Sequence, residues 1–243
     1  MIIDCHCHAG KGDELTAPWT TSAPIKQHLE RAEAAGIDKT VVFPVHSLNF
    51  ERANAEVAEI VNKHQDRLFG FARVHAINDR GRIGKLVETA VKDYGFRGIK
   101  VHGGEAFPGR EVLDAAKHFK IPVLLDTAND TQCVDMIAEA YPEVDLIVAH
   151  LGSFRNIWHV LLRTAEQLAT YPNVYADTSG IRFYDGLVNA INKAGAEKVL
   201  FGSDGPMLHP GIELQKVKHL YLSPEDEAKV LGNNFAKIIG EKL

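Results

Sequence analysis

Two histidines near the start of the chain have a spacing that suits a shared metal ion. They lie in the run Asp-Cys-His-Cys-His at residues 4–8. Side chains alternate between the two faces of a β-strand, so a strand here would place Asp4, His6 and His8 on one face. Cys5 and Cys7 would then face the other way, as small buried residues. Because two imidazoles on one face can hold one divalent ion together, we expect a metal site at His6 and His8.

The chain has twelve histidines, and many of them follow short apolar runs. Runs rich in Val, Ile, Leu and Phe predict strands over residues 2–6, 40–45, 68–74, 98–102, 122–126, 146–150, 174–177 and 199–203. The histidines at or just after the ends of these runs are His6, His8, His46, His75, His102, His150 and His209. The histidines in helical patterns, which we expect on the surface, are His28, His64, His118, His159 and His219.

Amphipathic stretches separate the predicted strands and supply the rest of a repeating unit. They predict helices over residues 24–35, 51–65, 81–93, 110–118, 131–140, 157–170, 184–194 and 210–220, with a last helical stretch from Ser223. This alternation, without a linker, predicts a (β/α)8 TIM barrel, an α/β fold in which residues 1–243 form a single domain. An open doubly wound sheet is the alternative. In a barrel, the carboxyl ends of the strands carry the active site, so the histidines there would meet.

Asp204 ends the last predicted strand, in the run Phe-Gly-Ser-Asp-Gly-Pro at residues 201–206. The first and last strands are neighbours once a barrel closes, so Asp204 would lie beside His6 and His8. A carboxylate there can bind the metal or take a proton from a metal-bound water, whose pKa falls towards ~7. We therefore expect Asp204 to be both a metal ligand and a catalytic residue.

Together these motifs resemble the amidohydrolase superfamily. The matching runs are Asp-x-His-x-His at 4–8, Ile-Val-Ala-His-Leu-Gly at 147–152 and Gly-Ser-Asp-x-Pro at 202–206. Residues 35–39, 71–75, 95–102 and 231–236 also resemble its amidohydrolase-related branch, which includes aminocarboxymuconate-semialdehyde decarboxylase and related nonoxidative decarboxylases. The resemblance implies a metal-dependent hydrolase or lyase with His6, His8 and Asp204 as ligands. It also implies that His150 binds the metal or acts in acid–base catalysis.

The fourth and fifth predicted strands leave the ligand set open. The family's fifth strand ends in a metal-binding histidine, but this chain has Asp126, which is either a fourth ligand or a substrate-binding residue. Lys100 and His102 share one face of the fourth strand, where relatives with two metals carry a carboxylated lysine. Lys100 therefore either bridges a second metal or binds a substrate carboxylate. His102, on the same face, is likewise expected to contact the metal or the substrate. We expect one divalent ion, zinc first and manganese or magnesium as alternatives, and we favour a second metal less.

Three more residues are expected to contact the substrate. Arg73 and His75 share the inward face of the third strand, and Arg73 either binds a substrate carboxylate or pairs with Asp4 or Asp177. Trp19 lies in the long loop of residues 9–23. It either covers the mouth of the barrel or packs on the scaffold.

Composition narrows the functional class. A chain of 243 residues with 45% hydrophobic and 24% charged residues is typical of a globular protein. The net charge of −5 gives no attraction to nucleic acid or to anionic lipid. The chain has no apolar run long enough to cross a bilayer, no signal-peptide pattern and too few cysteines for a disulfide framework. We expect a cytoplasmic protein with a small-molecule substrate and no nucleic-acid or membrane partner, and the family resemblance favours a homodimer.

The favoured function is a metal-dependent hydrolase acting on a small, carboxylate-bearing molecule through a metal-activated water, with Asp204 and His150 as catalytic residues. One alternative is a nonoxidative decarboxylase of the same branch. Another is a TatD-type metal-dependent nuclease, against which stand the net acidity and Lys100, where that family places a glutamate. A third is a noncatalytic binding protein whose metal site decayed at Asp126.

Overall fold

The computed structural model describes residues 1–12 and 22–242. In this part of the chain the strands are β1 (Ile3–Ala9), β2 (Lys39–Pro44), β3 (Leu68–Gly70), β4 (Ala72–Arg73), β5 (Ile99–His102), β6 (Val123–Asp126), β7 (Leu146–Val148), β8 (Val174–Asp177) and β9 (Val199–Leu200). The α-helices are α1 (Ile25–Ala34), α2 (Phe50–Lys63), α3 (Ile83–Lys92), α4 (Arg110–Phe119), α5 (Gln132–Ala140), α6 (Trp158–Thr170), α7 (Tyr184–Ala194), α8 (Pro210–Lys218), α9 (Pro224–Ala228) and α10 (Asn234–Ile238). Shorter helical segments are η1 (Ala149–Gly152), η2 (Ala196–Lys198) and η3 (Lys229–Asn233).

All strand pairs are parallel and follow the order of the chain, in two runs, β1 to β3 and β4 to β9. The two runs join at β3 and β4, which lie end to end as one strand of the barrel that is interrupted at Phe71. The N–H of Phe71 donates to the carbonyl of Val42, at 3.0 Å, while the N–H of Ala72 donates to Gly98 on the other side, at 2.8 Å. The combined strand therefore pairs with β2 on one side and with β5 on the other.

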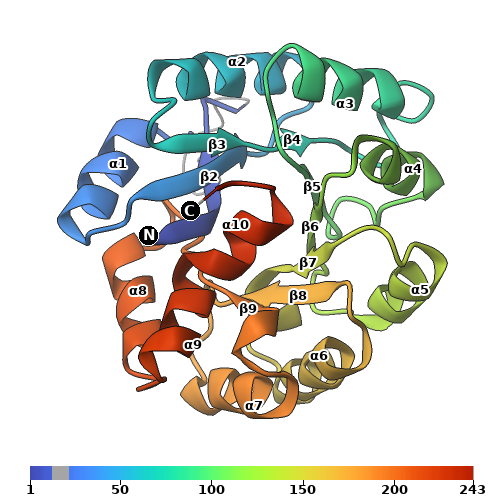
Figure 1. The fold of residues 1–243 in the computed structure, drawn as a ribbon. Helices are drawn as coiled ribbons and strands as arrows, with labels where there is room; N and C mark the ends of the chain where they lie inside the picture. Colours follow the sequence, from blue (N-terminus) through green and yellow to red (C-terminus); the bar gives the residue numbers. More distant parts are fainter. Residues whose placement is uncertain (13–21, 243) are drawn as a thin grey trace.

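The second junction lies between the first strand and the last. The N–H of Cys5 donates to the carbonyl of Phe201 at 3.0 Å, and the N–H of Asp204 donates to the carbonyl of His6 at 2.7 Å. These bonds close the sheet, and the helices surround it (Figure 1). The predicted TIM barrel is thus confirmed.

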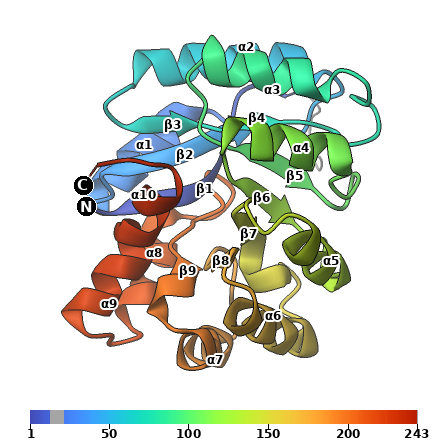
Figure 2. The ribbon, with the colours of Figure 1, turned by 45° about the vertical axis from the view of Figure 1, so that its right-hand side comes forward.

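One end of the barrel is sealed by the carboxyl-terminal helix. Figure 1 shows α10 crossing the centre of the view, and Figures 1 and 2 both place the two termini side by side. Phe235 of α10 packs on Phe71, with ring centroids 6.1 Å apart, and joins the apolar side chains that fill the barrel. The opposite end, where the strands finish, carries the polar side chains described below. In the described ranges no helix combines the length and apolarity needed to cross a bilayer.

Strand β1 contains a β-bulge that its alternating sequence does not reveal. Asp4 pairs with Thr40, but Cys7 pairs with Val42, so β1 has one residue more than β2 over this stretch. A bulge leaves two successive residues of the longer strand opposite a single residue of its neighbour, and side chains before and after it change faces.

The bulge corrects the predicted faces of β1. Cys5 packs inside the barrel among its apolar side chains, whereas Cys7 packs among side chains on the helix side, including Val57 of α2. Asp4 turns towards the helices, where its Oδ2 lies 3.7 Å from Nε2 of His28. The expectation that Asp4 shares a face with the two histidines was therefore wrong, as was the expectation that Cys5 faces the helices. His28, expected on the surface, is fully buried.

Candidate active site

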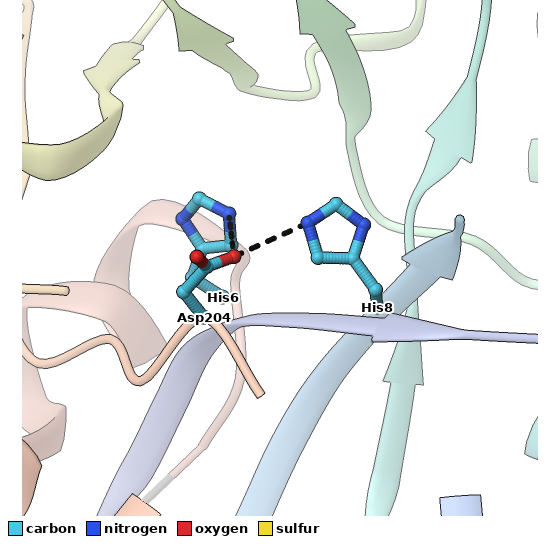
Figure 3. Close-up of side chains that lie close together, drawn as sticks. All are labelled: His6, His8 and Asp204. Atoms are coloured by element: carbon cyan, nitrogen blue, oxygen red, sulfur yellow. Dashed lines mark ion pairs between the residues drawn. The ribbon is translucent and has the colours of Figure 1, made fainter. Parts of the chain in front are cut away.

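His6, His8 and Asp204 converge at the open end of the barrel (Figure 3). The Oδ1 atom of Asp204 lies 3.4 Å from Nε2 of His6 and 3.2 Å from Nε2 of His8. Each side chain offers one ligand atom, and these atoms all lie within 4.8 Å of one another. Asp204 follows β9 and is tied to β1 by the backbone bond that closes the barrel, so the fold itself sets this juxtaposition.

The nitrogens of these imidazoles fit a metal ion. Nδ1 of His6 lies 2.8 Å from Oδ2 of Asp177, while its Nε2 is buried and makes no hydrogen bond to a described residue. Burial, assisted by the charge of Lys100, lowers the pKa of His6 to about 4. The ring is therefore neutral at pH 7, with Nδ1–H donated to Asp177 and a lone pair on Nε2. Metal-bound histidines commonly have this carboxylate behind the ring.

The carboxylate of Asp204 is held in its charged form. Burial alone would raise its pKa, but the hydrogen bond from His8 and the neighbouring rings of His6 and His150 outweigh burial and hold the pKa well below its usual range. Two imidazole nitrogens and one carboxylate are a donor set that both Zn²⁺ and Mn²⁺ accept. The three side chains thus form a candidate metal centre.

His150 stands beside this centre, although not at the end of a strand as predicted. Strand β7 stops at Val148, and His150 lies in the turn η1 with a φ of +56°. Its ring centroid is 4.8 Å from that of His6, and its backbone N–H donates to Oδ1 of Asp177 at 3.0 Å. We call His6, His8, His150 and Asp204 the histidine side of the site.

The opposite wall is built around an arginine. Arg73 is 2% exposed and donates to Oε1 of Glu105 at 2.7 Å, and the same oxygen lies 2.7 Å from Nδ1 of His46. Its pairing partner is thus Glu105, and neither of the acids suggested by the sequence, Asp4 and Asp177. Because its charge is compensated by Glu105, Arg73 is a fixed part of the wall.

Lys100 is the unusual cation of this wall. It is 0% exposed, it lines the cavity, and its Nζ makes no hydrogen bond to any described residue. The Nζ atom lies 5.1 Å from the centroid of the Phe43 ring. Burial lowers the pKa of Lys100, while the charge of Asp126 acts in the opposite direction. A buried amine without a partner is costly, so this nitrogen points to a ligand that would bind it.

Asp126 faces the same cavity but keeps apart from the metal trio. Its Oδ2 lies 3.1 Å from Nε2 of His102 and 3.7 Å from Nε2 of His150. Burial would raise its pKa, but Lys100 and the two histidines together lower it, so Asp126 is ionised. We call Arg73, Lys100, His102, Asp126 and Glu105 the lysine side of the site.

The two sides enclose a cavity of about 440 Å³. Its lining is His6, His8, Val45, His46, Arg73, Lys100, His102, Asp126, Ala128, Asn129, His150, Phe154, Arg155, Asp204 and Met207. His75 does not belong to this lining, because its Nδ1 accepts the N–H of Ile77 at 3.2 Å in its own loop. His209 caps α8 instead. The predicted substrate contact Trp19 lies outside the described residues.

Residues 3–240 match the amidohydrolase family. The chain belongs to that family. It is therefore an enzyme, and the resemblance predicted from the sequence is confirmed. No curated protein sequence matches this amidohydrolase.

Solved structures of other amidohydrolase-like proteins share the fold. An amidohydrolase from Burkholderia multivorans with bound zinc has a TM-score of 0.83, with 13% identity over 100% of both chains. The 5-carboxyvanillate decarboxylase LigW from Sphingomonas paucimobilis has a TM-score of 0.77, with 13% identity over 99% of both chains. A dihydroxybenzoic acid decarboxylase from Polaromonas sp. JS666, with bound manganese and 2-nitroresorcinol, has a TM-score of 0.73, with 19% identity over 98% of this chain and 96% of that one.

Sequence reasoning missed several residues of the site in this amidohydrolase. Asn129, Phe154, Arg155 and Met207 line the cavity, and Glu105 pairs with Arg73 of the lining. All five lie in loops that follow strands. Loops have no periodic pattern that assigns a side chain to one face. For Glu105 a usable signal exists, because it follows His102 by only three residues across Gly-Gly and is the first acid after that strand.

Proposed function

We propose that this amidohydrolase is a metal-dependent hydrolase that acts on a small, carboxylate-bearing molecule. The observation that carries the proposal is the position of Asp204 Oδ1, within 3.4 Å of Nε2 of both His6 and His8 and at the cavity wall. These three residues would hold the ion, for which we propose Zn²⁺, with Mn²⁺ as the alternative. When bound, such an ion polarises a substrate oxygen and lowers the pKa of a water molecule.

The chain supplies the proton transfer. Asp204 is ionised and 8% exposed at the cavity wall, so its carboxylate can take a proton from the attacking water and return it to the leaving group. His150 lies beside His6 on the same wall and is the second acid–base group. Asp177 holds the ring of His6 from behind, so the geometry is set before the substrate arrives.

The substrate class follows from the lysine side. Nζ of Lys100 has no partner among the described residues, and a substrate carboxylate would satisfy it. The cavity of about 440 Å³ suits a small molecule. Of its cationic lining, Arg73 and Lys100 are buried and only Arg155 is exposed, so the described wall offers no continuous basic track for a nucleic acid backbone.

Nonoxidative decarboxylation is the second candidate. A carboxylate held by Lys100 would lie in the same cavity as His150 and Asp126, two groups that can move a proton to or from the substrate. Decarboxylases also occur among the solved structures of the same fold. The two candidates use the same residues, so only products distinguish them.

The test combines metal analysis with a product assay. The purified protein, loaded with Zn²⁺ or with Mn²⁺, is offered lactones and amides that carry a free carboxylate, and aromatic acids in parallel. We expect one metal per chain, ring or amide opening without CO2 release, and loss of both metal and turnover in His6→Ala. Thr170→Val, which removes an exposed hydroxyl at the end of α6, away from the cavity, is the control. CO2 release from the acids would favour decarboxylation. Full activity in His6→Ala would refute the metal mechanism.

A further inference from the structure

Beneath the candidate metal centre, one buried carboxylate connects two of the three histidines of the histidine side, His6 and His150. Oδ2 of Asp177 lies 2.8 Å from Nδ1 of His6. Its other oxygen, Oδ1, accepts the hydroxyl of Ser179 at 2.6 Å, and Oγ of Ser179 lies 2.8 Å from Nδ1 of His150. All of these residues are buried, so solvent does not compete for the bonds.

The donors and acceptors in this hydrogen-bond network of Asp177, Ser179 and His150 follow from the number of protons that each group carries. Oδ1 of Asp177 also accepts the backbone N–H groups of His150 and Ser179, each at 3.0 Å, so this oxygen acts as an acceptor throughout. The hydroxyl of Ser179 has one proton and gives it to Asp177. Towards His150 the Ser179 Oγ can then only accept. The carbonyl of Ser179, 3.1 Å from the same Nδ1, is an acceptor as well.

We infer that Ser179 is a positioning residue that keeps the proton of His150 on Nδ1 and presents a bare Nε2 lone pair to the cavity. Both polar neighbours of Nδ1 accept, so this nitrogen must donate. On the other side of the ring, Oδ2 of Asp126 is 3.7 Å from Nε2, which is beyond hydrogen-bond distance and does not hold a proton there.

The inference deepens the proposed function and rests on it for its chemical consequence. With Nδ1 donating and Nε2 bare, His150 accepts a proton or a hydrogen bond from a group in the cavity. The substrate or water group that meets it must therefore carry an O–H or N–H. His150 is then a base, and an oxyanion-stabilising role for the resting ring is excluded.

The backbone conformation at His150 and Leu151 is held by the same hydrogen-bond network. His150 and Leu151 both have left-handed φ angles, +56° and +46°. Non-glycine residues adopt this conformation rarely and only where other contacts enforce it. Here the bond from the backbone N–H of His150 to Asp177 enforces it, so one carboxylate places the backbone and, through Ser179, selects the tautomer.

Long-range ¹H–¹⁵N correlation spectra of histidine-labelled protein with added Zn²⁺ test the inference directly. The His150 signals are assigned by their loss in His150→Gln. We expect Nδ1 in the protonated range and Nε2 in the unprotonated range. In Ser179→Ala only the backbone carbonyl of residue 179, at 3.1 Å, still accepts from Nδ1, so the Nε2 signal should shift part of the way towards the protonated range. Ser179→Thr, which keeps the hydroxyl, and the control Thr170→Val, which removes an exposed hydroxyl of α6, should leave both signals in place.

Two results would overturn the inference. A protonated Nε2 in the parent protein contradicts the tautomer, and an unchanged spectrum in Ser179→Ala shows that the hydroxyl does not select it. In the active enzyme we expect Ser179→Ala to lower kcat by about tenfold with little change in KM, and Ser179→Thr to restore it. The spectra need no substrate, so failure of the proposed reaction leaves this test intact, and failure of the tautomer leaves the metal and product assays intact.

Discussion

The two walls of the cavity are built on opposite principles. On the histidine side, the rings of His6 and His150 are each tied from behind to Asp177, directly or through Ser179. On the lysine side, Arg73 is paired with Glu105, but the equally buried Lys100 has no hydrogen-bond partner among the described residues. The rings of His6 and His150 are oriented before any small molecule binds, and Nε2 of His6 is left without a hydrogen bond, whereas the second wall leaves the amine of Lys100 without one. This difference supports the proposed assignment of a metal ion to the first wall and of an anionic substrate group to the second.

The largest expected effect tests the histidine side. Asp204→Asn keeps the shape of the side chain and one oxygen but removes the negative charge to which we assign proton transfer. We expect kcat to fall by about 10²–10⁴-fold, with KM changing much less. Steady-state kinetics on metal-loaded protein measure it. The matched control is Asp185→Asn, which changes an exposed acid in the first turn of α7. If the variant kept its turnover, proton transfer would have to be assigned to the other wall.

A second prediction concerns how the free energy of unfolding changes with pH because of His28, which lies on the helix side of β1. His28 is buried beside Asp4, and burial, with the charges of Arg31 and His209, lowers its pKa from 6.5 to about 4. The unfolded chain therefore binds a proton first as the pH falls, and the folded state loses stability between pH 6.5 and about 4. The loss from this one residue is about 3 kcal/mol.

Urea unfolding of metal-free protein across that pH range measures the effect. We expect His28→Phe, which keeps a ring but cannot titrate, to lose less unfolding free energy on acidification than the parent. Asp4 acts in the opposite direction, because burial raises its pKa to about 7 and its contribution falls as the pH rises. It is present in both proteins, so their difference is the effect of replacing His28 beside Asp4. Parallel curves for the two proteins would show that His28 does not contribute.

The histidine side was the part of the site that the sequence predicts best, for a physical reason. The separation between His6 and His8 matches the two-residue period of a strand, and barrel closure brings the end of β9, and with it Asp204, to the same edge. The sequence did not predict the bulge in β1, because the bulge depends on the register of β1 against β2. The alternation of Asp4 and Cys5 carries no sign of it.

The lysine side was harder to predict because its partners come from loops. The length and closure of the barrel follow from eight repeated units, and Lys100 and His102 share a face as the strand period requires. The pairing of Arg73 with Glu105 joins a strand to a loop, and no spacing rule connects the two. The turn at His150 depends on a hydrogen bond to Asp177 of β8, and a local sequence pattern does not reveal such a contact.

The third prediction tests the lysine side through its unpaired cation. Lys100→Met keeps the length of the side chain and removes the amine. We expect KM for a carboxylate-bearing substrate to rise by roughly ten- to hundredfold, because a charged hydrogen bond is lost. The metal content should stay the same. The free energy of unfolding should rise by about 1–3 kcal/mol, since an unsatisfied buried group disappears.

Kinetics, metal analysis and urea unfolding on one preparation check all three consequences. Lys100→Arg keeps a charge but adds bulk in a buried place, so it separates charge from fit. Loss of metal in Lys100→Met would make the lysine part of the metal centre, as in a two-metal site. That result would erase the division between the two walls.

The smallest expected effect lies where the two sides meet. Asp126 is 3.1 Å from His102 and 3.7 Å from His150, and it stands outside the trio of His6, His8 and Asp204. Its charge still acts on that trio through the low-dielectric cavity. We therefore expect Asp126→Ala to weaken metal affinity by only about tenfold, the size typical of an outer carboxylate.

Titration of metal-free protein with Zn²⁺ and with Mn²⁺ measures this effect. His6→Ala gives the size of a lost ligand, and Asp130→Ala serves as the control for removal of a nearby acid. A loss as large as that of His6→Ala would make Asp126 a full ligand and extend the metal centre across the cavity. An unchanged affinity would assign Asp126 entirely to the substrate.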